Sequence, residues 1–414
     1  MTAPLRSVSD HQAHVAALFG PARTVRVPIA DALGRALAVD VAAQVSLPGF
    51  DNSAMDGYAV RAADIADASA EEPVRLPVAE DIPAGRTDSL TLTEGTVHRI
   101  MTGAPMPAGA DAVVQVELTD GGDQTVTIHG SVGVGTAVRR AGSDIEAGEA
   151  ALLTGTVIGS SQIGLLAALG VAEVEVTAPL HVVVLSTGSE LIAPGNPLEH
   201  GQIYESNGAM LCAAVRSAGG EATLVHFVPD DVGQFRARLD EMIDGPAAVD
   251  LILTSGGVSA GAYEVVKDAL TGQGVDFLKV AMQPGMPQGS GRYTSATGTT
   301  VPIVTLPGNP VSAQVSFEIF VRPPLRSAMG LPAHRRRIQA ALADDLRSPR
   351  GKRQFRRGVF THAGGADGIG SVIPIGPPSS HHLRFLASAN ALIDIAADAD
   401  DVSAGTTVEV ILLD

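Results

Sequence analysis

The sequence predicts a multidomain α/β protein, in which a doubly wound parallel sheet is joined by a β-rich inserted domain and a small C-terminal β domain. The chain has 414 residues, a length typical of two to four domains. From residue 181 onward, continuous apolar stretches alternate with helical ones, which is the pattern of a parallel sheet covered on both faces. Between residues 47 and 140 the stretches are shorter and are separated by frequent turns, which indicates a small β-rich domain.

Two segments flank the β-rich region. Residues 1–46 are expected to form a helix and then extended chain, and Ser9, with a glutamine three residues later, has the pattern of a capping box. Residues 141–178 contain a turn, a helix that ends at Gly170 and an alternating strand. The sequence permits these two segments to pair as one discontinuous domain, into which residues 47–140 are inserted.

The doubly wound domain is expected over residues 179–328. Asn207 is a plausible cap of one of its helices, and its last helix is expected to end at Pro323. The prolines around that position mark a boundary to residues 329–414, whose alternating stretches predict strands. Strands are expected at 181–188, 221–230, 250–257, 276–282 and 301–308, and helices at 207–220, 231–244, 263–272 and 309–325.

Charge and composition exclude several classes of protein. The net charge of −17 argues against nonspecific binding to nucleic acid or to an anionic membrane. The single cysteine, Cys212, excludes an intrachain disulfide and fits a reducing, cytoplasmic compartment. The sequence has no apolar run long enough to span a bilayer and no signal peptide at its start. A soluble protein is expected, which binds anions only in a locally basic or amide-rich pocket.

Glycine-rich and acidic stretches follow four of the predicted parallel strands. They are "STGSEL" (186–191), "VPDD" (228–231), "TSGGVSAG" (254–261) and "LPGNP" (306–310). Ligands of an open parallel sheet bind where its strands end, and glycines with helix N-termini favour phosphate there. For one such turn alone the geometry of the chain is the better explanation, but four turns at one predicted edge favour a binding site.

Acidic residues occur at the same predicted edge. Glu190, Asp230, Asp231 and Glu264 have the hard oxygen ligands that suit Mg²⁺, which commonly bridges carboxylate and phosphate. The pattern alone leaves each acid undecided between this role and an ordinary structural one. The sequence contains no GxxxxGK[ST] or GxGxxG motif, so the two common nucleotide-binding loops are excluded.

Two further features lie outside the predicted sheet. In "DNSAMDGYAV" (51–60), Asp56 stands either in an ordinary tight turn or on a rigid loop that presents its carboxylate. Residues 335–357 contain nine of the 28 lysines and arginines. Most of these arginines are expected on a solvated strand face, and one or two are candidates for contact with an anion.

Six ordered segments of the sequence resemble one known family, the molybdopterin molybdenumtransferases, which comprise the bacterial MoeA proteins and the E domain of gephyrin. The resemblance covers essentially the whole chain, and the first segment alone is highly specific. The segments are "PGFDNSAMDGYAVR" (48–61), "RIMTGAPMPAGADAVVQVE" (99–117), "RRAGSDIEAGE" (139–149), "STGSEL", "TSGGVSAGAYEVVK" (254–267) and "LPGNPVSA" (306–313).

The resemblance implies an elongated homodimer of four-domain chains. Residues 1–46 and 141–178 would form the first domain, 47–140 the second, 179–328 a MoaB/MogA-like α/β domain, and 329–414 the last. The implied reaction inserts molybdate into adenylylated molybdopterin and releases AMP with the help of Mg²⁺. A molybdopterin adenylyltransferase and apo-molybdoenzymes are implied as further partners, and neither nucleic acid nor membrane is expected.

The resemblance also implies roles for individual residues. Asp56 would face the active site, that of the other subunit, with Thr102 and Asp144 in the same cleft. The remaining catalytic candidates are Asp230, Lys279, Arg357 and Ser380, of which Arg357 and Ser380 would contact the oxyanion. Glu190 and Glu264 would hold Mg²⁺. Residues expected around the adenylylated substrate are Ser186, Thr187, Gly188, Ser255, Gly256, Gly257, Ser259, Gly261, Pro307, Gly308, Asn309 and Pro310.

The chain departs from the family pattern in two places. Glu264 stands where the family often has aspartate, which keeps the charge. The family often has "KPGKP" where this chain has "QPGMP", so Gln283 and Met286 replace two lysines associated with molybdate. Either Lys279, Arg292 and the arginines of the last domain compensate for the lost charges, or activity is altered. An altered paralogue or a scaffold, which binds adenylylated molybdopterin without efficient metal insertion, is therefore the alternative.

Overall fold

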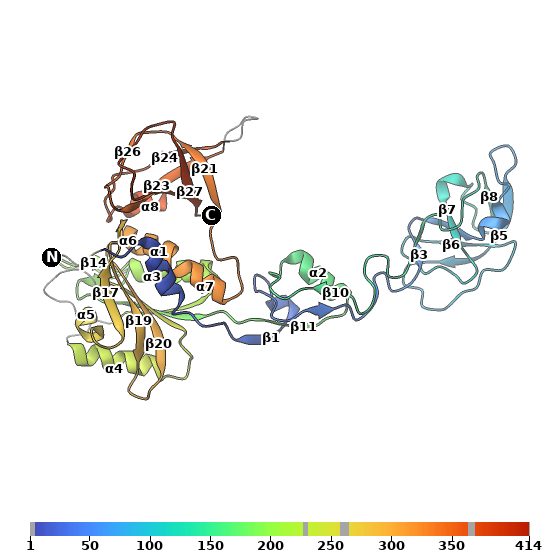
Figure 1. Cartoon of the computed structure of the whole chain (residues 1–414). Coiled ribbons are helices and arrows are strands. Elements are labelled where there is room, and N and C mark those ends of the chain that lie inside the picture. Colours follow the sequence, from blue (N-terminus) through green and yellow to red (C-terminus); the bar gives the residue numbers. More distant parts are fainter. Residues whose placement is uncertain (1–4, 227–230, 257–264, 363–368, 414) are drawn as a thin grey trace. The chain divides into compact units, whose positions relative to one another are not determined.

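The computed structural model describes residues 5–226, 231–256, 265–362 and 369–413. The chain divides into two compact units, which are coloured along the sequence in Figure 1. Unit 1 comprises Met1–Val25, Gly34–Ala36 and Thr177–Asp414, and unit 2 comprises Arg26–Leu33 and Leu37–Val176. Among the helices that the structure describes, none is long and apolar enough to cross a bilayer.

A six-stranded sheet forms the centre of unit 1. Its order is β15 (Glu221–His226), β12 (His181–Ser186), β16 (Leu251–Ser255), β20 (Thr300–Leu306), β19 (Pro287–Thr294) and β17 (Val275–Lys279). The first four strands are parallel, as predicted from their continuous apolar sequences. Strand β19 runs antiparallel to both of its neighbours and was not predicted. Its glycines and proline gave it the composition of a turn, yet the adjacent backbone leaves no room for a Cβ at Gly291.

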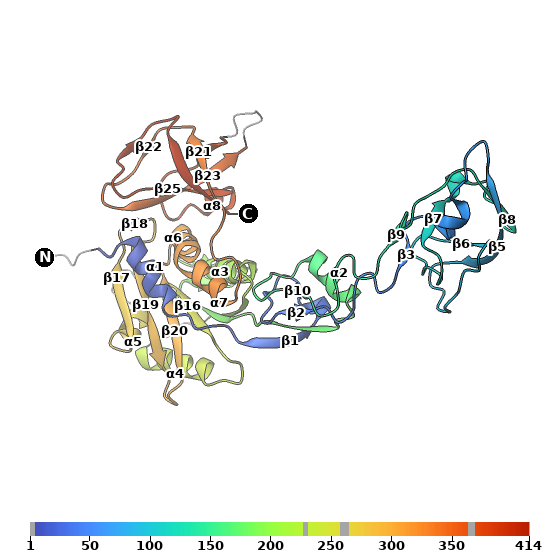
Figure 2. The same ribbon diagram turned by 45° about the vertical axis from the view of Figure 1, so that its right-hand side comes forward.

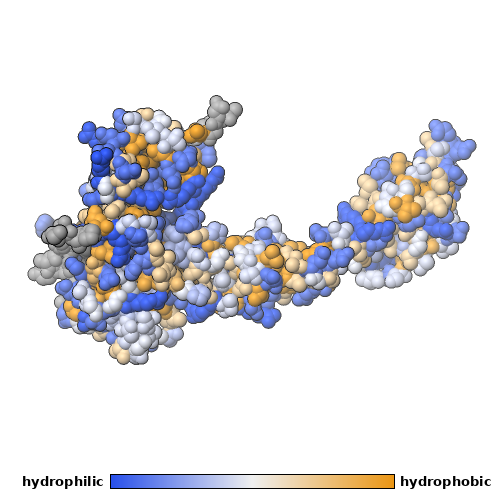
Figure 3. Space-filling model, in the orientation of Figure 1, coloured by the Kyte–Doolittle hydropathy of each residue, from blue (hydrophilic) through white to orange (hydrophobic). Residues whose placement is uncertain are grey.

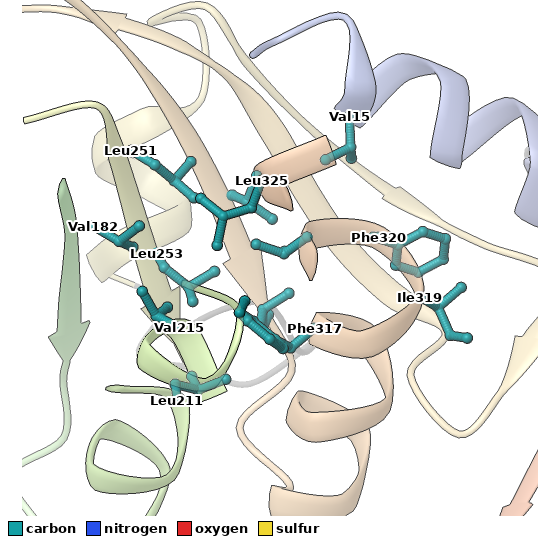
Figure 4. Close-up of a cluster of buried hydrophobic side chains, with 14 of the residues drawn as sticks. Val15, Val182, Leu211, Val215, Leu251, Leu253, Phe317, Ile319, Phe320 and Leu325 are labelled. Atoms are coloured by element: carbon teal, nitrogen blue, oxygen red, sulfur yellow. The ribbon is translucent and has the colours of Figure 1, made fainter. Parts of the chain in front are cut away.

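Helices cover both faces of this sheet, which confirms the doubly wound architecture. They are α1 (Val8–Ala16), α3 (Asn207–Ser217), α4 (Val232–Ile243), α5 (Val265–Leu270), α6 (Pro310–Ser316) and α7 (Arg322–Ala328). Because successive strand residues point to opposite faces, Val182 and Val184 of β12 pack with residues of α1, α3, α6 and α7. Figure 4 shows part of this cluster, with Val182 and Leu253 beside Leu211 and Phe317. Val183 and Leu185 pack on the other side, against α4 and α5.

The predicted boundaries of two helices are wrong. Helix α1 begins at Val8 and is capped by Ser7, whose Oγ accepts a hydrogen bond from the Asp10 amide at 3.0 Å, so Ser9 is not the cap. The last helix does not end at Pro323. It continues from α6 through a π-helical turn, η4 (Phe317–Val321), into α7. Pro323 and Pro324 stand in the first turn of α7, directly after the π-helical turn.

The C-terminal part of unit 1 is a closed β structure. The strands are β23 (Arg353–Thr361), β24 (Ser371–Pro374), β21 (Arg337–Leu342), β27 (Thr407–Leu412) and β25 (Ala391–Ile395), and β25 pairs with β23 to close the ring. Strand β18 (Met282–Gln283) comes from the α/β part and adds in parallel to β23. Figure 2 shows β18 where the C-terminal strands meet the α/β part. The remaining elements of unit 1 are α8 (Leu383–Ala387) and the strands β13 (Leu191–Ile192), β14 (Ile203–Tyr204), β22 (Leu346–Arg347) and β26 (Asp401–Val402).

Unit 2 contains a five-stranded sheet in the order β7 (Ala112–Gln115), β4 (Gly57–Val60), β6 (Val97–Ile100), β5 (Val74–Ile82) and β8 (Thr125–Ile128). Its other part joins the two flanking segments. Strand β2 (Val41–Ala42) pairs with β10 (Ala150–Leu152), and Leu37 pairs with Val176. The further elements are β1 (Thr24–Pro28), which crosses into unit 1, β3 (Asn52–Ser53), β9 (Val138–Arg139), α2 (Ser160–Ala168) and β11 (Glu173–Thr177). The division into four domains at the stated boundaries stays a prediction.

Candidate functional site

Three predicted binding loops begin side by side at one edge of the sheet of unit 1. Strands β12, β16 and β20 pair in a register that aligns Ser186 with Ser255, and Ser255 with Leu306. The amide of Gly256 donates to the carbonyl of Leu306 at 3.1 Å, with φ at +102°. A Cβ on Gly308 would lie 3.4 Å from the Gly256 Cα, so small residues allow the loops to approach each other closely.

The structure therefore brings together most of the residues predicted to surround the substrate. Those that it places at this edge are Ser186, Thr187, Gly188, Ser255, Gly256, Pro307, Gly308, Asn309 and Pro310. Ser186 and Ser255 are buried, whereas Thr187 and Gly188 are partly exposed. Gly257, Ser259, Gly261, Asp230 and Glu264 lie outside the described residues, so their predicted roles stay predictions.

Two residues behind these loops were missed by the sequence reasoning. Asn207 was expected to cap a helix, but it is the first residue of α3, and its Nδ2 donates to Ser255 Oγ at 2.9 Å and to the Gly308 carbonyl at 2.6 Å. Its side chain thus ties two binding loops together. Glu205, which is 5% exposed, accepts from Ser186 Oγ at 3.1 Å and from the Gly208 amide at 2.6 Å. The polar "ESN" stretch before α3 was the available signal, but it also has the composition of an ordinary helix cap.

With the adenylate placed at these loops, as the family resemblance implies, we expect replacement of Asn207 by Leu to weaken AMP binding about tenfold. The substitution removes both hydrogen bonds between the loops and leaves Ser255 Oγ and the Gly308 carbonyl to find new partners. The measurement is calorimetric titration with AMP. Asn196→Leu is the matched control, because the Asn196 side chain donates only to the nearby Ala193 carbonyl in an exposed turn. An AMP affinity unchanged in a folded Asn207→Leu protein would contradict the prediction.

The described acids provide one placed candidate for holding a metal. Glu190 is exposed, and its carboxylate lies over the Gly188 backbone, since a Cβ on Gly188 would be 2.8 Å from Glu190 Oε2. Asp231 instead caps α4, where Oδ1 accepts from the Gln234 amide at 2.8 Å. No group of three potential metal ligands occurs among the residues that the structure describes. The metal-holding role of Glu190 therefore stays a prediction.

A cavity of about 480 Å³ adjoins the "LPGNP" loop. Its walls come from the "QPGMP" loop, which contributes Gln283, from Gly308 and Asn309, and from Ser379 and Ser380 of the C-terminal part. The last wall is held in place because the Val311 amide donates to the Ser380 carbonyl at 3.1 Å. None of the described residues that line this cavity is charged, so any ligand there is bound by hydroxyl, carboxamide and backbone groups.

The cations expected to compensate for the missing lysines do not line this cavity. Arg357 is 2% exposed, and its guanidinium donates to the carbonyls of Pro377 and His382, the latter at 3.2 Å. Burial holds its pKa below the usual range. Lys279 is exposed at the end of β17, and Arg292 donates to the Leu18 carbonyl at 2.7 Å. Arg357 thus anchors the segment that carries Ser380.

Most other arginines of the cluster at residues 335–357 also have structural partners. Arg353 and Arg337 both bind the carboxylate of Asp394, whose side chain is 3% exposed. Arg335 binds Glu318 at 2.9 Å. The expectation of a solvated strand face is therefore wrong for Arg335 and Arg353, which are half-buried against these acids, whereas Arg337 is exposed as expected.

In unit 2 a second group of predicted residues is assembled around Asp56. Asp56 Oδ1 accepts from both the amide and the hydroxyl of Thr102, each at 2.7 Å. The Thr102 amide, and then its hydroxyl, hold the pKa of Asp56 below its usual range. Asp51 accepts from the Ala141 amide at 2.8 Å and pairs with Arg140. This anchors the segment on which the exposed Asp144 lies.

The chain is similar over its full length to proteins of known family. Residues 6–170 match the MoeA N-terminal region (domain I and II), residues 183–327 a probable molybdopterin binding domain, and residues 339–413 the MoeA C-terminal region (domain IV). Molybdopterin molybdenumtransferase 2 of Mycobacterium tuberculosis is 56% identical to this chain. The alignment covers 98% of this chain and 99% of that relative. Molybdopterin molybdenumtransferase of Bacillus subtilis is 34% identical, with 94% of this chain and 89% of the relative covered. A crystal structure of the molybdopterin biosynthesis MoeA protein from Pyrococcus horikosii has a TM-score of 0.82 at 30% identity, covering 99% of this chain and all of that one.

Proposed function

Because the chain belongs to the molybdopterin molybdenumtransferase family, we propose that it inserts molybdate into adenylylated molybdopterin and releases AMP. A role as a transferase in molybdenum cofactor biosynthesis is supported by its relatives' names. The observation that carries the finer proposal is the edge of the sheet in unit 1. There, glycine-containing loops in one register, tied by Asn207, open beside an uncharged cavity.

In this proposal the two parts of the substrate site have separate tasks. The adenylate lies against the backbone of the loops at Gly188 and Gly256, where the absence of side chains permits close approach. The molybdate oxyanion lies in the adjoining cavity, where Ser312, Ser380 and Gln283 offer hydrogen-bond donors. Asp230 and Lys279 remain catalytic candidates by resemblance alone. AMP leaves when a water oxygen bonds to one of the two phosphorus atoms and the phosphoanhydride bond between the pterin phosphate and the adenylate breaks.

We expect nucleotide binding to require Mg²⁺ and to lose that requirement in Glu190→Gln. The Glu190 carboxylate stands over the Gly188 backbone, where without a cation it would repel a phosphate. AMP affinity is measured by titration with Mg²⁺ and with EDTA. The parent protein should bind at least tenfold more tightly with Mg²⁺, and the variant equally in both. Glu199→Gln, on the exposed turn after this loop, is the control and should keep the Mg²⁺ dependence.

We expect a homodimer, in which Asp56 of one chain serves the site of the other. Unit 2 exposes large apolar side chains that a monomer would leave in water, at Leu33, Val39, Val45, Phe50 and Leu153. Figure 3 shows apolar surface on the part of this unit that carries α2 and β10. Sedimentation velocity at micromolar concentration measures the state, and a strictly monomeric protein would refute the expectation.

Complementation of a bacterial strain that lacks this enzyme tests the proposed function. Restored molybdoenzyme activity supports metal insertion in the cytoplasm, with a molybdopterin adenylyltransferase upstream and apo-molybdoenzymes downstream. The uncharged cavity favours one second candidate, a paralogue that binds adenylylated molybdopterin but inserts metal poorly. Growth at low and high molybdate separates the efficient enzyme from the paralogue, because the paralogue would restore molybdoenzyme activity at high molybdate only. A pure scaffold would restore activity at neither concentration.

A further inference from the structure

A second cavity, of about 450 Å³, lies beside the uncharged one. The two cavities share Gln283 and Pro378 in their linings and are therefore neighbours. The rest of the second cavity is built from the C-terminal β structure, by the segment around Ser348, by Gln354 of β23, and by Asp400 and Asp401. Its size is sufficient for a bicyclic heterocycle. Nothing in the proposed roles of the first cavity and the glycine loops uses this space.

Two buried polar atoms of this cavity have no partner among the described residues. They are Gln354 Oε1, in a residue that is 1% exposed, and Ser348 Oγ, in a residue that is 4% exposed. Buried polar groups in folded proteins nearly always have a hydrogen-bond partner, because leaving one unpaired is costly. The same cavity thus has two unpaired acceptors, which are free to accept hydrogen bonds from a molecule bound there.

The polar lining includes unpaired oxygen atoms and two carboxylates. Gln354 and Ser348 present oxygen atoms inside, and the carboxylates of Asp400 and Asp401 stand at the exposed rim. The positive charge at the rim, Arg347, is opposed by Asp401, 3.6 Å from its Nε. Asp400 likewise lies 3.9 Å from the Nε of Arg350, so the lining offers phosphate or molybdate no unpaired positive charge and favours a neutral ring with N–H donors on one edge.

We propose that this cavity binds the aminopyrimidinone edge of the pterin, with Gln354 and Ser348 as specificity-determining residues. The inference rests on the proposed function, which supplies a pterin-containing substrate. The ring amino group and the adjacent ring N–H donate to Gln354 Oε1 and Ser348 Oγ. Gln283 is the register partner of Gln354 in the β18–β23 pair and contributes a neutral carboxamide to both cavities.

Titration of the full-length protein with free pterin tests the proposal. The chain has no tryptophan, so the fluorescence of the bound pterin can be followed directly. Pterin is compared with lumazine, which carries a second carbonyl in place of the ring amino group. We expect the unaltered protein to bind pterin at least tenfold more tightly than lumazine. Gln354→Leu and Ser348→Ala should each reduce pterin affinity about tenfold and remove most of the preference over lumazine.

The controls separate this inference from folding and from the proposed function. Thr361→Val, at the exposed end of the same strand β23, should bind pterin as the parent does. AMP is titrated in the same samples. The AMP titration tests the nucleotide site independently, because free pterin can bind without a nucleotide. The affinity for AMP should be unchanged in every variant. Equal affinities for pterin and lumazine, no saturable pterin binding, or unchanged pterin affinity in both folded variants would each overturn the inference.

Discussion

Replacing Asp56 by Ala is expected to lower the rate of molybdenum insertion about 100-fold or more while leaving the melting temperature unchanged. A carboxylate placed for acid–base or metal chemistry contributes on the order of 10²–10⁴-fold to a rate. The Asp56 side chain is exposed, and it is held by the amide and hydroxyl of Thr102 in a rigid turn. Its removal therefore takes away a charge without opening a core. The measurement is the rate of molybdenum cofactor formation by purified protein at saturating substrates.

The chain contains a matched control for this experiment. Asp40 accepts from the amide of Thr154 at 2.7 Å and from its hydroxyl at 2.8 Å, the same arrangement as Asp56 with Thr102. The same two hydrogen bonds lower the pKa of Asp40. Asp40→Ala should leave the insertion rate as it is, since only the position of the carboxylate differs. Equal effects of the two substitutions would show that Asp56 serves the fold alone.

The pH dependence follows from the direction of the Asp56 pKa shift. A carboxyl whose pKa is depressed stays ionised down to a lower pH than the ordinary value of about 3.9. Thr102→Val removes the hydroxyl donor, raises this pKa and should move the acidic limb of the rate profile to higher pH. Thr102→Ser keeps the hydroxyl and should restore the parent profile.

Gln283→Lys with Met286→Lys is expected to lower the molybdate concentration at half-maximal insertion by about tenfold or more. The cavity beside the glycine loops offers a dianion only neutral groups among its described lining residues. A charge-assisted hydrogen bond is about twice as strong as a neutral one. The single variants refine the prediction, because Gln283 lines the cavity and Met286 is absent from its lining. Gln283→Lys alone should therefore produce most of the change.

A third lysine variant controls for long-range attraction. Gln273→Lys adds the same charge on an exposed turn of unit 1, outside the lining of this cavity. It should leave the half-saturating molybdate concentration within about twofold of the parent value, since exposed charges are screened by salt. If Gln273→Lys has the same effect as Gln283→Lys, or if the double variant binds molybdate no better while folded, local charge is not what limits this protein.

The parts of the site that sequence patterns predict are those made by contiguous residues. Continuous apolar strands that end in glycines predicted the parallel sheet and the loops at Ser186, Ser255 and Pro307. Both features depend on residues that are adjacent in the sequence. The family resemblance was confirmed over the whole chain. Strand β19 was missed, since its glycines serve close packing with neighbouring strands, which are distant in sequence.

Sequence patterns did not predict the contacts between residues that are distant in the sequence. Nothing local shows that Asn207 donates to Ser255 and Gly308, or that Arg357 uses its donors on the carbonyls of Pro377 and His382. Arginine in a basic cluster has the same sequence appearance whether it binds an anion or a buried carbonyl. The choice is made by burial and by which donors are already occupied, and both depend on the assembled chain.

The two-residue strand β18 couples ligand binding to the contact between the α/β part and the C-terminal ring. It attaches the C-terminal ring to the α/β part, and Gln283 within it lines both cavities. A ligand that spans these walls binds only the docked arrangement, so it stabilises docking by mass action. At a concentration of 100 times its dissociation constant, the gain is about 2.7 kcal/mol. In the proposed binding mode, the substrate therefore stabilises the contact between the two parts, and local separation of the C-terminal ring becomes rarer as the substrate concentration rises.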